Sequence, residues 1–279
     1  MQSFPQEIKG IIFTEIIPNL IPEVDMQSLV RLGSIVRKIN RSAVYEPLTD
    51  ALRKIQWVKL TAIEAQSIES EIANAMEPSA IVTYPFGQIR HSLAITDALL
   101  HTKSALDSIA VFLADFLKLR ARGANRDFKK PEFREEIYSN DFVLATRLKT
   151  LEPWFQELQE VRDEWIHRSS IRNMLIVGPS ECGPLPIPRK DLNLGLRAFD
   201  RPITRKNFFS TKEFLDHHYN NLITIFKAVV ERCIEIELIA VTEPPLDLEV
   251  EKKLGAFPLK STQPMNLAKF KVKIGPLGF

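Results

Sequence analysis

The sequence predicts an all-α protein with one small irregular or β-ribbon insert, and two observations carry this prediction. Long segments place apolar residues at three- and four-residue steps, which is the spacing of one face of an α-helix. One segment, 174–209, is instead rich in proline, glycine and short apolar runs, which predicts an irregular insert or a small β-ribbon. A chain of 279 residues with 45% hydrophobic residues is long enough to bury a sizeable core.

The first 85 residues predict an N-terminal helical extension. The segment 25–42 has helical apolar spacing and begins at Asp25, a candidate N-cap. The segment 47–75 predicts one long helix with Pro47 in its first turn. The segment 77–87 holds two prolines and a glycine, so it is the best internal boundary.

Residues 86–241 predict a helical bundle that contains the 174–209 insert. The segment 122–133 is a polar connection, because Gly123 and Pro131 interrupt the helical pattern. Ser210 and Glu213 match a capping box. In this motif the side chain of each residue accepts a hydrogen bond from the backbone N–H of the other, at the start of a helix. We therefore expect four bundle helices, at 91–120, 132–150, 153–172 and 211–241. The remaining tail, 242–279, is expected to be loosely ordered or to lie as a strap over the domain.

The composition excludes several classes of protein. The net charge is only +2, so no overall basic excess indicates a nucleic-acid binder. Cys182 and Cys233 lie far apart without metal-ligand spacing, which predicts neither a metal site nor a disulfide framework. No apolar run is long enough to span a membrane, and the first residues lack signal-peptide order. We expect a cytoplasmic protein with no cofactor and no membrane partner.

The segment 161–170, VRDEWIHRSS, is the candidate functional site. Asp163 and His167 are four residues apart and share a helix face, so the carboxylate can orient the imidazole. Arg162 falls near the apolar stripe, where a guanidinium needs a carboxylate, a phosphate or an interface. Together these groups supply what phosphoryl transfer without a metal needs, because imidazole moves protons and arginine stabilises phosphate charge. The alternative is a solvated helix face with an ordinary Asp–His pair.

The segment Arg162-Asp-Glu-Trp-Ile-His167 resembles the Arg-x4–6-His motif of the HEPN superfamily, in which a polar residue commonly follows the arginine. In that family the motif lies on a late helix of a small bundle, as it does here within 86–241. The segment HTKSALDSIAVFL, 101–113, also resembles the helix that precedes the motif in one bacterial HEPN subgroup. A tyrosine that one toxin group carries two residues after the histidine is replaced by Ser169, so its nucleotidyl modification is not implied.

The resemblance implies a homodimer in which two motif helices form one composite cleft. It implies metal-independent RNA cleavage, with the 2′-hydroxyl attacking the adjacent phosphate. His167 would act as general acid and base, Arg162 would bind phosphate, and Asp163 would orient one of them. Many members act in toxin–antitoxin or antiviral defence systems, so an antitoxin or regulatory protein is a possible partner. Two alternatives stay open, a catalytically inactive HEPN-like bundle that binds RNA or protein, and a helical scaffold without nucleic acid.

Other residues have both a functional and an ordinary interpretation. Asp107 either reaches Arg162 from the neighbouring helix or pairs with Lys103 four residues away. The pair His217 and His218 is expected to be a solvated helix start rather than a metal site. The two tryptophans Trp154 and Trp165 are expected in the core or a dimer interface. The basic run near Phe128 is either a phosphate-binding loop or a solvated linker; its residues, with Arg168 after the motif, are candidate RNA contacts: Arg120, Arg122, Arg126, Lys129, Lys130 and Arg168.

Overall fold

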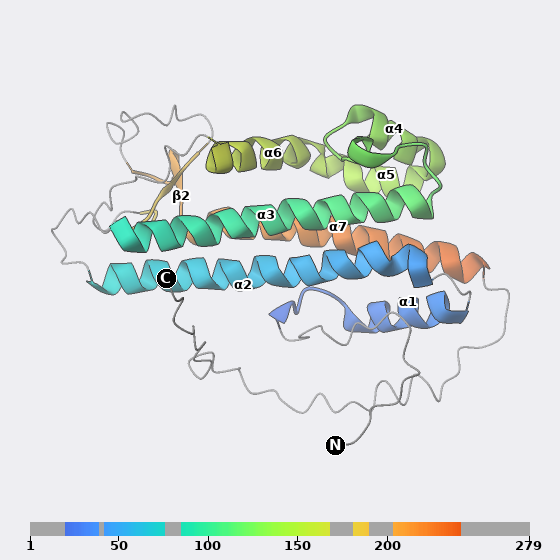
Figure 1. Ribbon diagram of the computed structural model, residues 1–279, viewed down its shortest axis with the longest axis horizontal. Helices are drawn as coiled ribbons and strands as arrows, with labels where there is room; N and C mark the ends of the chain where they lie inside the picture. The colour runs from blue at the N-terminus through green and yellow to red at the C-terminus, as the bar shows by residue number, and fades with distance from the viewer. Residues whose placement is uncertain (1–19, 39–41, 76–84, 168–180, 190–202, 241–279) are drawn as a thin grey trace, which may run out of the picture. The chain divides into compact units, whose positions relative to one another are not determined.

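A computed structural model describes residues 20–38, 42–75, 85–167, 181–189 and 203–240 (Figure 1). The contacts within the chain divide it into two units, 1–241 and 242–279. The second unit lies wholly outside the described residues, as does the predicted tail that forms it. The following description therefore concerns the first unit alone.

The described residues of the first unit are mostly α-helical, which confirms the predicted all-α class. The only strand pairing in its described residues is one short two-stranded sheet. No helix in the described ranges has the length and apolar character needed to cross a membrane. The helices are α1 (Met26–Lys38), α2 (Glu46–Ala75), α3 (Pro85–Phe116), α4 (Pro131–Asn140), α5 (Phe142–Leu148), α6 (Glu152–His167) and α7 (Thr211–Ala240).

The long helices α2 and α3 pack along each other and form the centre of the bundle (Figure 1). Helix α7 contacts both of them, and it also contacts α1 and α5. Helix α6 lies along α3 and runs in the opposite direction (Figure 1). Residues assigned from the sequence to an N-terminal extension thus pack directly against the predicted motif bundle.

Aromatic packing joins the residue before α2 to the last turns of α3. The ring of Tyr45 lies 5.1 Å from that of Phe112 and 5.9 Å from that of Phe116. The Tyr45 hydroxyl donates to Oε1 of Glu237 on α7 at 3.0 Å, and Glu237 is buried. This hydrogen bond satisfies a polar group that would otherwise be costly to bury. It ties the start of α2 to the end of α7.

Capping side chains fix several helix ends where the sequence predicted them. Asp25 accepts from the Gln27 N–H at 2.9 Å and so caps α1. Ser210 and Glu213 cap α7 reciprocally, with the Ser210 N–H donating to the Glu213 carboxylate at 3.0 Å and the Glu213 N–H donating to the Ser210 hydroxyl at 3.1 Å. The predicted helix 91–120 instead spans Pro85–Phe116, because Lys118 adopts a left-handed φ of 56° that stops helical winding.

The predicted continuous helix 132–150 is wrong, because the chain breaks at Asp141. This residue has φ −150° and ψ 86°, outside the helical region, and separates α4 from α5. Its carboxylate accepts from the Leu144 N–H at 3.0 Å, which caps α5. A short 3-10 helix, Lys149–Leu151, then leads into α6, where Pro153 occupies the first turn as expected.

The insert contains the small β-ribbon that the sequence predicted as one of two outcomes. Strand β1 (Ile187–Pro188) pairs antiparallel with β2 (Phe208–Phe209), with Ile187 opposite Phe209. Cys182 is buried beside β2, and its Sγ lies 3.6 Å from the Phe208 carbonyl oxygen. Because β2 immediately precedes α7, this pairing fixes the insert to the start of the last helix.

Candidate functional site

Helix α6, which carries the motif, is fixed against α7 by two adjacent histidines. Trp154 donates from Nε1 to Nδ1 of His218 at 3.1 Å. Nε2 of His217 lies 3.1 Å from a carboxylate oxygen of Glu157, one turn further along α6. The expectation that both histidines are solvated is wrong for His218, which is 2% exposed, because neighbouring helix residues point about 100° apart and only His218 points into the core.

These two environments drive the histidine pKa values in opposite directions. Burial lowers the pKa of His218 to about 4, because the charged form loses its hydration. The hydrogen bond with Glu157 raises the pKa of His217, since the carboxylate favours the protonated ring. Within the described residues no group of three or more histidine, cysteine or acidic side chains is placed to hold a metal ion.

Arg162 and Asp163 form the part of the motif whose side chains the structure describes. Nη2 of Arg162 donates to the Asp163 carboxylate at 3.0 Å. Gln159, one turn earlier, donates to both oxygens of the same carboxylate at 2.7 and 2.8 Å. The Arg162 side chain is 25% exposed, and its Nε is buried without a hydrogen-bond partner among the described residues.

The remaining motif residues are described only in part or not at all. His167 is the last residue of α6, so its backbone is helical, but its side chain lies outside the described residues. The side chain of Trp165 also lies outside them, and so does the whole of Arg168. The backbone keeps Asp163 and His167 four residues apart on one regular helix, which places them on one face.

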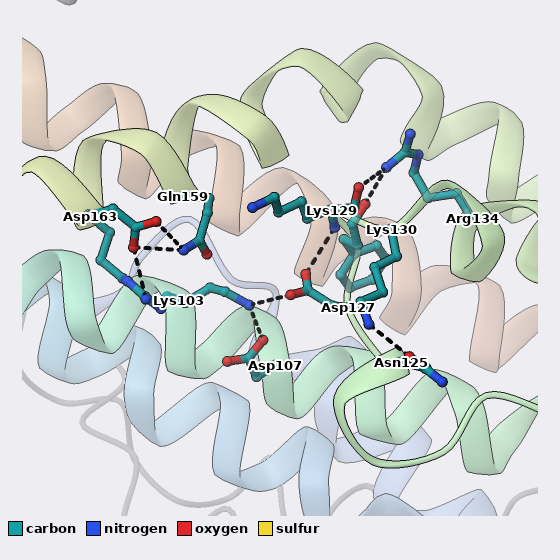
Figure 2. Close-up of polar contacts among 11 residues, drawn as sticks. Lys103, Asp107, Asn125, Asp127, Lys129, Lys130, Arg134, Gln159 and Asp163 are labelled. Atoms are coloured by element: carbon teal, nitrogen blue, oxygen red, sulfur yellow. Dashed lines mark hydrogen bonds and ion pairs between the residues drawn. The ribbon is translucent and has the colours of Figure 1, made fainter.

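A buried lysine lies on α3 beside the motif helix. Lys103 is 8% exposed and forms ion pairs with Asp107 and, at 3.3 Å, with Asp127 (Figure 2). The expected ion pair between Asp107 and Lys103 is therefore present, whereas a contact between Asp107 and Arg162 stays a prediction. Figure 2 shows Gln159 and Asp163 of α6 on the same side of the molecule as this cluster.

The basic segment near Phe128 forms many of its contacts within itself. Arg122 donates to the carbonyl oxygens of Leu119 and Ala121 at 2.6 and 2.9 Å. Arg126 donates to the same Ala121 oxygen at 3.2 Å and pairs with Asp115 at 2.9 Å.

The two lysines after these arginines differ in their contacts. The ammonium of Lys130 donates to Asn125 at 2.7 Å, whereas that of Lys129 contacts no polar group among the described residues (Figure 2). Arg122 and Arg126 thus hold the loop in shape, and Lys129 is the lysine of this run most available to a phosphate.

Sequence reasoning missed the burial of Lys103 and the hydrogen bonds of Gln159. Lys103 lies four residues before Asp107, but the sequence cannot show that a loop residue, Asp127, covers it. Gln159 lies four residues before Asp163, so helical spacing alone could have identified that hydrogen bond.

A groove of about 550 Å³ was also not predicted. It lies among α4, α5 and α6 and is lined in part by Tyr138, Phe142 and Lys149. Tyr138 and Phe142 are 56% and 59% exposed, and their ring centroids lie 5.2 Å apart. Their exposure depends on the turn at Asp141, which the predicted continuous helix did not contain.

A second buried polar cluster lies where α2, α3 and α7 meet the insert. The half-buried Glu69 carboxylate lies near Thr211 and Leu185, and its Oε1 has no hydrogen-bond partner among the described residues. Nε2 of His91 lies within hydrogen-bond distance of Oγ1 of Thr211, at 3.0 Å. Burial lowers the pKa of His91 to about 4 and raises that of Glu69, since both charged forms are poorly hydrated.

No family model, curated protein or solved structure matches this chain. A functional conclusion therefore has to rest on the geometry of the residues around α6.

Proposed function

We propose that this chain is a HEPN-like, metal-independent endoribonuclease that acts as a homodimer. The observation that carries the proposal is the environment of Arg162. Its guanidinium is tied to Asp163 on one side, while its buried Nε has no partner among the described residues. The side chain is nevertheless 25% exposed, so a phosphate can bind the part of the guanidinium that faces solvent.

A phosphodiester is the anion that suits the neighbouring histidine. His167 follows Arg162 by five residues at the end of the same helix. In the proposed reaction one His167 imidazole accepts the 2′-hydroxyl proton as that oxygen attacks the adjacent phosphorus. The bond from phosphorus to the 5′-oxygen breaks, and the His167 imidazolium of the second copy donates a proton to the leaving oxygen. The products are a 2′,3′-cyclic phosphate and a 5′-hydroxyl.

Asp163 acts as a positioning residue in this proposal. Its carboxylate accepts hydrogen bonds from Gln159 and Arg162 at once, which limits the rotamers open to the guanidinium. Arg162 then stabilises the extra negative charge on the phosphate in the transition state. Lys129, Lys130, Arg122, Arg126 and Arg168 are the proposed contacts to the RNA backbone, Lys129 first among them.

Cleavage of a single-stranded RNA by the full chain in the presence of chelator tests the proposal. We expect cleavage by the wild type and losses of about 100-fold or more for His167→Ala and Arg162→Ala. Arg205→Ala is the matched control, because Arg205 is 71% exposed and forms only an ion pair with Glu213 at 3.9 Å through its side chain. A substrate with a 2′-deoxy sugar at the cleaved position should resist. Equal activity in all four proteins would indicate contamination and contradict the proposal.

A catalytically inactive binding module is the second candidate, and the groove beside α4 and α5 favours it. Exposed aromatic rings such as Tyr138 and Phe142 are typical of surfaces that bind bases or protein side chains. Retention of the same RNA without cleavage, lost in Phe142→Ala but not in His167→Ala, supports this second function over the first.

A further inference from the structure

The groove among α4, α5 and α6 has an aromatic lining that stays partly open to solvent. The buried rings of Phe128 and Phe155 line it, with their centroids 5.0 Å apart and their planes at 28°. Tyr138 and Phe142 also line it, and both remain more than half exposed. Their ring planes lie at 79°, so the two rings do not cover each other as a parallel stack would. Exposed rings around a groove of this kind are typical of a ligand site.

Basic side chains border the same groove. Arg134 and Lys149 line it, and Lys149 is exposed. Nη1 of Arg134 donates to the carbonyl oxygens of Phe128 and Lys129 at 2.6 and 2.9 Å, which holds the Lys129 backbone beside the groove. The Lys129 ammonium contacts no polar group among the described residues. Aromatic rings bordered by cations complement a ligand that joins an aromatic base to a phosphate.

A row of polar side chains leads from this groove toward the motif. Figure 2 shows the Lys129 side chain between Arg134 and Gln159, with its ammonium on the Gln159 side. Along α6 itself, Glu152 lines the groove and Arg162 follows ten residues later, which corresponds to about 15 Å. One extended ligand can therefore contact both the groove and the motif.

We propose that this groove binds one unpaired base of the RNA strand that is cut at the motif, an inference that rests on the proposed function. A base stacks on the ring of Phe142 or Tyr138, and Lys129 and Lys149 contact the phosphates that flank it. A strand with stacked bases covers about 15 Å in about four to five nucleotides, at about 3.4 Å each. The groove thus selects single-stranded RNA, since a base that is paired within a duplex cannot enter it.

The charged side chains of the groove favour a nucleotide over an apolar protein side chain. Glu135 is exposed in the lining, and a carboxylate accepts a hydrogen bond from the exocyclic amino group of a base. Glu152 pairs with Arg134 at 3.9 Å, whereas neither Lys129 nor Lys149 forms an ion pair within the described ranges. A peptide that inserts an apolar side chain would use the rings but not these polar groups. A base with its phosphates uses both.

Binding of an uncleavable strand to the full chain tests the inference. The probe is a short fluorescent oligoadenylate with 2′-O-methyl sugars, which lack the hydroxyl that attacks the phosphorus. We expect Phe142→Ala to raise the Kd of this strand, measured by fluorescence anisotropy, about tenfold, because one base loses its stacking partner. An abasic strand of the same length should bind the wild type and Phe142→Ala equally, since it has a backbone but no base to stack.

Two variants separate stacking from other effects of the substitution. Phe142→Tyr keeps an aromatic ring and should bind like the wild type, which excludes damage to the turn at Asp141. Trp57→Ala removes a comparably exposed ring, at 52%, from α2 and outside the groove, and should leave the Kd unchanged. Equal Kd values for the wild type and Phe142→Ala overturn the inference and leave the groove to a protein side chain. Adenosine monophosphate that binds as tightly as the strand also overturns it, because the ligand is then a free nucleotide.

Cleavable strands locate the bound base. A single abasic nucleotide moved along the RNA should raise KM, with little change in kcat, at one position about four or five nucleotides from the cut bond. In Phe142→Ala that position should no longer differ from the others. A position effect of the same size in Phe142→Ala overturns the inference.

Failure of this inference and failure of the proposed function give different results. A wild type that binds the oligoadenylate through Phe142 but cleaves no RNA keeps the base-binding groove and rejects the ribonuclease. A wild type that cleaves RNA, together with a Phe142→Ala variant that binds and cleaves equally well, keeps the ribonuclease and rejects the groove.

Discussion

Trp154 donates from Nε1 to Nδ1 of His218 across 3.1 Å, and both side chains are buried. An indole N–H can only donate, so Nδ1 of His218 is the acceptor and this ring is neutral with its proton on Nε2. The bond joins the first turns of α6 to the first turns of α7. Its geometry therefore couples the position of the motif helix to the protonation of one buried histidine.

We expect this pair to make stability depend on pH. The pKa of His218 falls from 6.5 in an unfolded chain to about 4 in the fold, so the unfolded state binds the proton first as pH falls. The stabilisation is complete above about pH 6.5 and is lost as pH falls toward 4. In His218→Phe the difference in unfolding free energy from the wild type should shrink over that window. Urea unfolding followed by circular dichroism at pH 7.5, 6 and 5 measures it.

His217, the residue before His218, makes stability depend on pH in the opposite direction. The hydrogen bond with Glu157 raises its pKa, so its stabilisation is present below pH 6.5 and is lost as pH rises through the raised value. Its side chain is 41% exposed, so solvent screening limits the effect to about 1 kcal/mol or less. We expect His217→Gln to be destabilised at pH 5.5 and unchanged at pH 8.5. A larger loss at high pH would contradict this assignment.

Asp141 should be one of the most sensitive carboxylates in the bundle. Its side chain is 2% exposed, pairs with Arg232 at 2.7 Å and caps α5. Removing it loses the cap and leaves the arginine without this partner, which costs about 3 kcal/mol in Asp141→Ala. Asp141→Asn keeps a capping oxygen and should lose less. Asp115→Ala breaks the more exposed pair with Arg126 and should cost under about 1 kcal/mol by thermal unfolding.

Lys103 should control the order of the basic loop. Lys103→Ala leaves Asp107 and Asp127 facing a cavity without their cation, so we expect a loss of about 2 kcal/mol. Amide hydrogen exchange of residues 122–130 should accelerate in this variant. Lys129→Ala should leave both quantities unchanged. Unaltered exchange in Lys103→Ala would show that the ion pairs do not hold the loop.

Thr211 tests the polar cluster at the insert. Thr211→Val keeps the shape but removes the hydroxyl, so the buried His91 ring loses its hydrogen-bond partner. We expect a loss of about 2 kcal/mol, whereas Thr211→Ser should lose less because it keeps the oxygen. Chemical denaturation of the two variants distinguishes the hydroxyl from the methyl group.

Local signals predicted much of this fold. The Ser210–Glu213 capping box and Pro153 mark helix starts that depend on neighbouring residues alone, and the structure confirms both. The break at Asp141 was missed because apolar periodicity continues across it. The dipeptide Asn140-Asp141 was the available warning, since such residues cap helices and form turns.

Burial was harder to predict than helix position. The charged group Lys103 and the imidazole of His218 become buried only because segments far along the chain cover them, and no local pattern encodes that contact. Arg162 was expected near the apolar side, and a buried Nε agrees with that placement. The catalytic roles of Arg162, Asp163 and His167 stay predictions.

The turn at Asp141 also gives the surface a shape. A straight helix over 131–151 would measure about 30 Å and would present its side chains along a rod. The break at Asp141 changes the chain direction between α4 and α5 instead. Tyr138 and Phe142 lie on either side of this break and line the groove. The same residue that pairs with Arg232 of α7 thus shapes a groove with an aromatic lining.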